Sequence, residues 1–354
     1  MVGHGKLMLC FPTRVKRASL GAIAFACVML ATTTVGADTT TSTSTTTPSS
    51  SSSTTTSTVP KPVHVAPLTG LPDPRGLTRH HSALTVKIDN TYEARPQFGI
   101  NEADVVYEEI VEGGITRLAA VFDSQLPSVV GPVRSVRRTD REIVFPLGGV
   151  FACSGGALYA LQSIATAPVK FLDQSTSGAA MFRDSARYAP HNLLANAQLL
   201  MKLGGRTKPP RAIFEYRPHG STAPGARVGA FTVGFASGYA TSYTWDQKTS
   251  SWNRFIFGRP DVVASGAQLS PKNVIVMNVN YRGGVGVIGA EAVLTGSGPV
   301  EIFTDGRVER GTWSRGSLAK PIVYKNNGRV IALTPGQTWV ELLDTAERAT
   351  ITAN

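Results

Sequence analysis

Apolar and polar residues alternate over short stretches in the first half of the chain. Residues 82–89 place three branched apolar side chains on one face, which predicts a half-buried strand. Residues 105–112 and 115–122 are further strand-like runs, and the two glycines between them indicate a hairpin. A short apolar run at 149–153 predicts a buried strand. Together these segments predict a sheet near the start of the folded sequence.

Segments with a helical period follow these strands. Residues 135–145 predict a charged helix, and residues 157–165 predict a second helix. Residues 193–203 predict a third, because Asn192 is placed to cap its start and two glycines follow its end.

After Pro209-Pro210 the helical periods disappear, and short aromatic runs alternate with turn signals. The strand-like runs cover residues 243–245, 252–257, 273–281, 300–303 and 322–324. Two of them are followed by Asp-Gly or Asn-Gly, the strongest short-range signals of a hairpin. We therefore predict a meander, sandwich or partial barrel of about eight strands.

This change from helical periods to strand and turn signals divides the folded sequence into two parts. We predict an α+β chain with an N-terminal mixed α/β domain at residues 67–208, a C-terminal β-rich (meander- or sandwich-like) domain at 209–345 and a tail at 346–354. We also expect each domain to form a core of its own.

The N-terminus has the pattern of a secretory signal. A basic segment precedes an uncharged apolar run at 18–30, and Val35 and Ala37 supply the small residues expected before a cleavage point. We predict that residues 1–37 are removed and that the mature chain begins at Asp38. A retained anchor is the alternative, because the uncharged run approaches spanning length.

The cysteines bear on lipid attachment and on disulfides. Cys27 is disfavoured as a lipidation site, because the apolar run continues beyond it. Removal of the leader leaves Cys153 as the only cysteine, so we expect no internal disulfide. Cys153 lies where a buried strand meets a glycine turn, with His191 as the candidate base. A buried core thiol is favoured over a nucleophile.

The segment behind the leader contains only Ser and Thr from residue 39 to residue 58, except Pro48. It can bury no apolar area, so we predict a disordered stalk at residues 38–66, either a glycosylated wall-spanning stalk or a solubilising linker.

Composition and charge exclude several classes of protein. The chain has 354 residues, 42% of them hydrophobic, with a mean hydropathy near zero, which excludes a polytopic membrane protein and a wholly disordered one. The net charge is +11; without the four basic residues of the leader, 31 bases face 24 acids, which gives +7. This mild excess suits an anionic partner but falls short of a nucleic-acid binder.

The common cofactor and metal motifs are missing or misplaced. Residues 284–289 match the glycine pattern of dinucleotide sites, but no helix follows. The histidines lack helical metal-ligand spacing, and His80-His81 is interpreted as an exposed doublet. We expect no cofactor and no metal.

The first domain carries a dense set of charged residues. They are Glu108, Glu109 and Glu112 around one strand, Arg117 on its hairpin partner, and Arg134, Arg137 and Arg138 at a helix start. The three last arginines follow a spacing that places them on one helical face, and Glu108 and Glu112 would share one face of the strand. The set fits a salt-bridged seam, an anion-holding cleft or carboxylates acting on a glycan.

Several longer motifs resemble the bacterial YerB-like lipoprotein family of unknown function. They are PLTGLP at 67–72, ARPQ at 94–97, ADVVYE at 103–108, EGGITR at 112–117, GPVRS at 131–135, APHNL at 189–193 and PGQTWVEL at 335–342. The resemblance covers both domains and implies an extracytoplasmic protein with an α/β-like N-terminal and a β-rich C-terminal domain. It supplies no catalytic residue, and the lipoprotein cysteine is absent.

These observations favour an exported binding or accessory protein at the cell envelope, secreted or attached to the cell surface. The expected partner is an anionic wall component or an envelope protein, with no nucleic acid, and with membrane contact only if the leader is retained. The candidate ligand-binding residues are Arg117, Arg134, Arg137, Arg138, His191, Glu108 and Glu112. A hydrolase of wall polymers that uses Glu108, Glu109 or Glu112 is the alternative.

Overall fold

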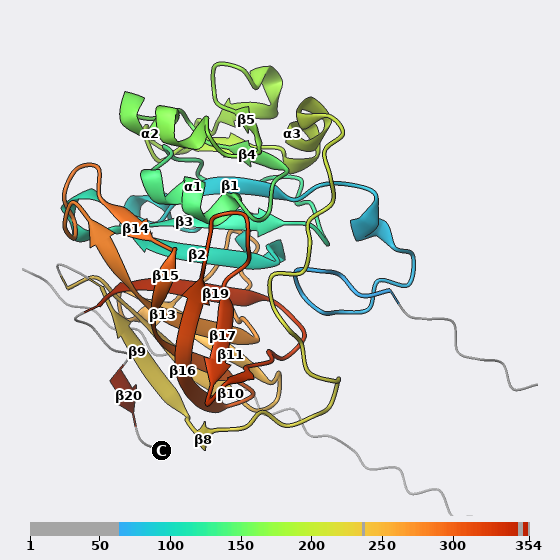
Figure 1. Cartoon of the computed structure of the whole chain (residues 1–354). Coiled ribbons are helices and arrows are strands. Elements are labelled where there is room, and N and C mark those ends of the chain that lie inside the picture. The colour runs from blue at the N-terminus through green and yellow to red at the C-terminus, as the bar shows by residue number, and fades with distance from the viewer. Residues whose placement is uncertain (1–63, 236–237, 346–349, 353–354) are drawn as a thin grey trace, which may run out of the picture. The chain divides into compact units, whose positions relative to one another are not determined.

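The computed structural model describes residues 64–235, 238–345 and 350–352 of the chain (Figure 1). The predicted leader, its cleavage after Ala37 and nearly all of the stalk lie outside these residues and stay predictions. Within the described part, no helix is both long and apolar enough to cross a membrane.

The predicted strands of the N-terminal domain form one end of a mixed sheet of 13 strands. In spatial order they are β2 (Val105–Ile110), β3 (Thr116–Phe122), β1 (Leu84–Asp89), β4 (Val150–Ala152) and β5 (Lys170–Leu172). Every residue of β1 is buried. The prediction of a half-buried strand was therefore wrong, because other parts of the chain cover both faces of β1.

The same sheet continues into the C-terminal domain. Its strands there are, outward from β2, β19 (Thr338–Asp344), β13 (Asn273–Arg282), β15 (Gly296–Thr304), β16 (Arg307–Arg315), β17 (Val323–Asn326) and β18 (Arg329–Val330), with β14 (Glu291–Val293) beside β13 and β8 (Ala226–Arg227) beside β16. Strands β15 to β18 are consecutive antiparallel neighbours, which is the predicted meander.

A second sheet completes the C-terminal domain. Its strands are β12 (Arg259–Pro260), β11 (Ser251–Ile256), β10 (Ala240–Asp246), β9 (Ala230–Gly234) and β20 (Thr350–Thr352). The fold is therefore α+β, with a β-rich C-terminal domain, as predicted.

Strand β19 joins the two domains into one structure. It pairs in parallel with β13 on one side and with β2 on the other (Figure 1). The buried apolar residues of both domains form one contiguous cluster. The expectation of separate cores was therefore wrong, because a C-terminal strand completes the N-terminal part of the sheet. The boundary near Pro209-Pro210 stays a prediction.

Three α-helices lie around the β1–β4–β5 end of the sheet (Figure 1). They are α1 (Arg138–Val144), α2 (Leu158–Ile164) and α3 (Ala197–Gly204). Helix α2 agrees with the prediction. Helices α1 and α3 begin later than predicted, and Leu193–Ala195 forms β7 instead, paired with β6 (Met181–Arg183). Asn196, not Asn192, caps α3, and its side chain accepts a hydrogen bond from Leu199 N at 2.9 Å.

Single-turn 3-10 helices occupy several connections. They are Leu77–Arg79, Tyr92–Ala94, Ile100–Glu102, Glu112–Gly114 and Gly178–Ala180. The 3-10 helix Glu112–Gly114 follows the end of β2, so Glu112 lies outside the strand.

Candidate functional site

The two faces of the β2–β3–β1 part of the sheet carry different polar groups. Asp89, Arg117 and Glu109 stand directly opposite one another on the three strands, so their side chains share one face. Glu108 lies on the other face, because successive side chains of a strand point to opposite sides. The charged residues therefore form two separate groups.

Asp89, at the end of β1, contacts the side chains of both Arg134 and His191. Its Oδ2 atom accepts a hydrogen bond from His191 Nδ1 at 2.7 Å and pairs with Arg134 Nε at 2.9 Å. The Asp89 side chain is fully buried, whereas 19% of the Arg134 side chain and 20% of the His191 side chain are exposed. Because a carboxylate can only accept, His191 Nδ1 carries the proton here and Nε2 stays available to another partner.

Two backbone segments bring these side chains to β1. The Arg134 N–H donates to the Lys87 carbonyl at 2.8 Å, which holds residue 134 beside the strand. The Thr91 hydroxyl lies 3.2 Å from His191 Nδ1, the ring nitrogen that also contacts Asp89. Asp89 therefore holds both side chains in defined positions.

Glu112 organises the neighbouring pair of arginines. Its carboxylate accepts from Arg137 Nε at 2.7 Å and from Arg117 Nη2 at 3.2 Å. Partial burial alone would raise the pKa of Glu112, but the hydrogen bonds and charge of Arg137, followed by Arg117, lower it to about 2. Burial, and then repulsion from Arg137, lower the pKa of Arg117 to about 10.

The hydrogen-bond donors of the three arginines are used to different extents. The guanidinium of Arg137 donates hydrogen bonds to Glu112 and to the carbonyls of Ser135 and Val136. Arg117 donates to Glu112 and to Ser135 O. The Nη1 and Nη2 atoms of Arg134, by contrast, contact no partner among the described residues. We call Asp89, Arg117, Arg134, Arg137, Glu112 and His191 the arginine cluster; its three arginines face two carboxylates.

Two predicted members lie outside this cluster. Arg138 stacks its guanidinium over Tyr159, 4.9 Å from the ring centroid. The prediction of three arginines on one helical face was wrong, because α1 begins at Arg138, Arg137 is its extended N-cap residue, and Arg134 precedes the helix. Glu108 does not share a face with Glu112 or orient the arginines, since it belongs to the other face of the sheet.

Glu109 belongs to a buried triad next to the cluster. Lys87 Nζ lies 2.8 Å from Asp140 Oδ1 and also binds Glu109. Burial, and then the charge of Glu109, raise the pKa of Asp140 to about 6, although Lys87 opposes this shift. Glu109 and Glu108 are both inaccessible to solvent. Neither can reach a polymer in this structure. Glu112, the third carboxylate of the hydrolase alternative, is partly exposed but paired with Arg117 and Arg137.

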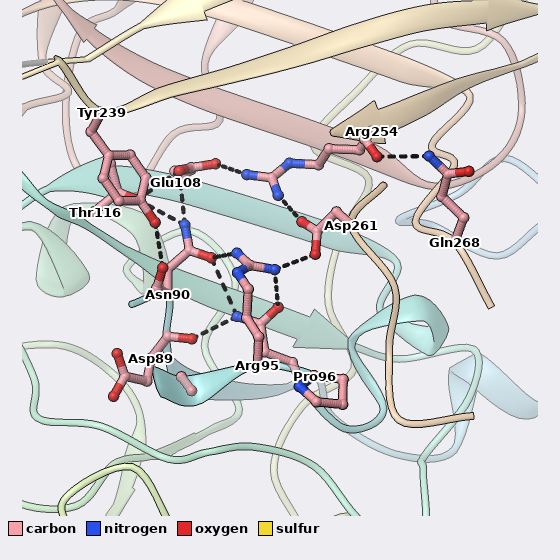
Figure 2. A network of polar contacts seen from close by, with 12 residues as sticks. Asp89, Asn90, Arg95, Pro96, Glu108, Thr116, Tyr239, Arg254, Asp261 and Gln268 are labelled. Atoms are coloured by element: carbon pink, nitrogen blue, oxygen red, sulfur yellow. Dashed lines mark hydrogen bonds and ion pairs between the residues drawn. The ribbon is translucent and has the colours of Figure 1, made fainter. Parts of the chain in front are cut away.

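Glu108 lies in a polar network between the two domains (Figure 2). It accepts from Thr116 at 2.6 Å, from Asn90 at 3.0 Å and from Arg254 Nη2 at 2.6 Å. Asp261 binds both Arg254 and Arg95. The sequence analysis did not identify Arg254 or Asp261, because a lone charged residue in a β-rich segment carries no pattern that marks it as buried.

Glu341 adds a third carboxyl group to this network. It stands opposite Glu108 in the β19–β2 register and accepts from the Tyr243 hydroxyl. Burial, and then the charge of Glu108, raise the pKa of Glu341 well above its ordinary value. Because Arg254 and Glu341 come from the C-terminal domain and Glu108 from the N-terminal one, the network connects the two domains.

Cys153 is an inert thiol. It is buried, and burial raises its pKa to about 12, so it carries no thiolate at neutral pH. The structure therefore agrees with the core-thiol interpretation. Among the residues that the structure describes, no three metal-ligating side chains converge on a common point.

Comparisons with known proteins match both parts of the chain. The protein-family model described as "Protein of unknown function (DUF3048) N-terminal domain" matches residues 68–209. The family model of the corresponding C-terminal domain matches residues 231–340. The chain belongs to the DUF3048 family. The predicted resemblance to YerB-like proteins is thereby confirmed.

Individual DUF3048 relatives extend this result. The chain is 26% identical over 304 residues to "Putative lipoprotein YerB" of Bacillus subtilis (strain 168), which covers 81% of this chain and 88% of the relative. The crystal structure of YerB from Bacillus subtilis covers 82% of this chain and all of its own chain, with a TM-score of 0.71 at 23% identity. This structural similarity shows that the chain and the relative have the same fold.

Proposed function

We propose that this protein is an exported, envelope-associated binding protein without enzymatic activity. Its arginine cluster would hold an anionic group of a wall component or of an envelope partner. This proposal rests on the contacts that the guanidinium nitrogens of Arg134 make and leave unmade. Its Nε lies 2.9 Å from a buried Asp89 oxygen as an ion pair without a well-aligned hydrogen bond, and its two terminal nitrogens pair with no described residue.

The chemistry of the cluster suits an anion. Two parallel N–H groups of a guanidinium match the two oxygens of a carboxylate or phosphate. His191 contacts the same Asp89 carboxylate through Nδ1, and its Nε2 adds a second donor when the ring is protonated. Because Asp89 holds both side chains in place beforehand, a ligand would have little side-chain entropy to remove.

The proposed extracytoplasmic location is supported by the leader sequence and by the name of a relative. The N-terminal sequence has a signal pattern followed by a Ser/Thr segment. The Bacillus subtilis relative carries the name "Putative lipoprotein YerB", and this name supports an extracytoplasmic location. We extend this location to the present chain, with the stalk in place of the lipid.

Co-sedimentation with purified bacterial cell wall tests the proposal. We expect Arg134→Ala to weaken wall binding by about tenfold and to make the remaining binding less sensitive to salt, because a free guanidinium is lost. Arg134→Lys should restore part of the affinity. Arg206→Ala is the matched control, because it removes an exposed positive charge from the same domain.

Two results would overturn the proposal. Wall binding that is unchanged in Arg134→Ala would remove the arginine cluster as the binding site. Release of soluble wall fragments by the purified protein would show an enzyme instead.

A further inference from the structure

A second candidate site lies in the C-terminal domain, around the strands β8 and β16. The cavity there has a volume of about 620 Å³ and is lined by Arg227, Arg307, Trp245, Gln247, Ser250 and Asp305, among others. These strands lie at the end of the structure away from helices α1 to α3 (Figure 1). The cavity shares no lining residue with the arginine cluster.

The two arginines of this cavity stand directly opposite each other. Arg227 on β8 pairs with Arg307 on β16, so their side chains leave the sheet on the same face. Like charges in this position repel each other and destabilise the strand pair. Arg307 Nη1 donates to Gly225 O at 2.8 Å, but no described carboxylate pairs with either guanidinium. An anion between them would remove the repulsion.

The backbone holds this unfavourable pair in place. A Cβ atom at Gly225 would lie 2.2 Å from Val308 O, so only glycine allows the close approach of β8 to β16. Val228 N donates to Gly306 O at 2.9 Å on the other side of Arg227. The two guanidinium groups are therefore brought together by the fold rather than by flexible side chains alone.

An aromatic ring, Trp245, also lines the cavity. Trp245 packs on the buried Trp252 with a centroid distance of 5.0 Å. A Cβ atom at Gly306 would lie 2.8 Å from Trp245 Nε1, so the β15–β16 turn contacts the edge of the indole directly. The ring remains partly exposed. It offers a rigid apolar surface beside two cations.

We propose that this cavity binds a sugar ring that carries a carboxylate or a phosphate. The anionic group would lie between Arg227 and Arg307, and the apolar C–H face of the ring would stack on Trp245. Gln247 and Ser250 offer amide and hydroxyl groups for the sugar hydroxyls. A bare anion would not use the indole, and a neutral sugar would leave the arginine pair unbalanced.

Isothermal titration of the full chain with defined probes tests this site. The probes are tetragalacturonate and glucose 6-phosphate as the two anionic sugars, a neutral galactose tetramer, and inorganic phosphate. We expect at least one anionic sugar to bind at least tenfold more tightly than the neutral tetramer and than phosphate. Binding should also change the tryptophan fluorescence, because Trp245 is part of the site.

Variants separate this site from general electrostatic attraction. Arg227→Gln should lower the affinity at least tenfold, with no loss of melting temperature in the free protein, because it also removes the repulsion between the two arginines. Arg329→Gln, on the exposed strand β18, is the matched control and should bind like the wild type. Arg134→Ala should also leave this binding unchanged, so the result does not depend on the arginine cluster.

Three outcomes would overturn this proposal. They are equal affinity for the neutral and anionic tetramers, binding that survives Arg227→Gln, and no binding of either anionic sugar at millimolar concentration.

Discussion

Two arginines three residues apart differ in what their guanidinium groups can still bind. Arg137 has its donors on Glu112 and on two carbonyls, whereas the terminal nitrogens of Arg134 meet no described partner. An arginine that is fully paired within the protein stabilises the fold, and one with free donors can hold a ligand. Spacing in the sequence cannot distinguish the two, because neighbours distant in sequence take up the donors.

At the same scale, Asp140 gives the protein a specific pH response. Burial, and then the charge of Glu109, raise its pKa from 3.8 to about 6. The folded state therefore binds this proton more tightly than the unfolded state, so the free energy of unfolding falls as the pH rises from about 4 to about 6. The slope for one such group is at most about 1.4 kcal/mol per pH unit.

Asp140→Asn tests this response, because an amide does not titrate. We expect the difference in unfolding free energy between wild type and variant to fall by about 1 kcal/mol or more between pH 4 and pH 6, measured by urea denaturation. Asp173→Asn is the control. Hydrogen bonds from Ser175 and Thr176 outweigh slight burial and lower the pKa of Asp173, so its curve should stay parallel to the wild type over this range. Parallel curves for Asp140→Asn would contradict the prediction.

Part of the candidate site could be predicted from residue types alone. The structure brings together Arg117, Arg134, Arg137, His191 and Glu112, five of the seven residues that the sequence had indicated as candidate ligand-binding residues. The role of Asp89 as the residue that holds Arg134 and His191 could not be predicted. It depends on a loop contact across 102 residues of chain, which no local pattern encodes.

At the scale of the element, strands were easier to predict than the ends of helices. Alternation and Asn-Gly or Asp-Gly turns located β1, β2, β3 and the hairpins of the second domain. Helix α1 begins at Arg138, because the preceding backbone is bonded to other segments. Arg134 N donates to Lys87 O, Arg134 O accepts from Ser154 N, and Val136 N donates to Gly155 O. Such tertiary contacts override a helical period that the residues themselves would support.

The start of α3 provides a test at this scale. Asn196 accepts a hydrogen bond from the Leu199 N–H with its side chain, which satisfies one of the free donors at the helix start. We expect Asn196→Ala to lower the free energy of unfolding by about 1 kcal/mol, whereas Asn196→Asp should keep it, measured by chemical denaturation. Equal losses in both variants would contradict this role, because aspartate caps a helix as well as asparagine does.

At the scale of the whole molecule, the order of strands couples the two domains. Strand β19 closes the edge of β2 along its length, and the pair Arg254–Glu108 crosses between the domains with no solvent access. Neither link could be predicted from the sequence, because both join segments more than a hundred residues apart. Loss of the C-terminal domain would expose the unpaired backbone of β2 and leave the buried Glu108 without its cation.

We therefore expect the two domains to unfold as one unit. Every tryptophan lies after residue 240, so tryptophan fluorescence reports on the C-terminal domain, including strand β19 at its junction with β2. Hydrogen exchange of β1 and β3, followed by mass spectrometry, reports on the N-terminal domain. In a urea titration both signals should change at the same midpoint. Separate midpoints would mean that each domain is stable alone, as the sequence had first suggested.

Arg254→Ala sharpens this test, because the residue belongs to the C-terminal domain but pairs with a carboxylate of the N-terminal one. Removal of one partner from a fully buried ion pair costs about 3–5 kcal/mol. If the domains unfold together, the midpoint reported by β1 and β3 should fall as far as the midpoint reported by the tryptophans. If only the fluorescence midpoint moves, the shared sheet does not couple the domains. Gln247→Ala, an exposed change in the same domain, should move neither midpoint.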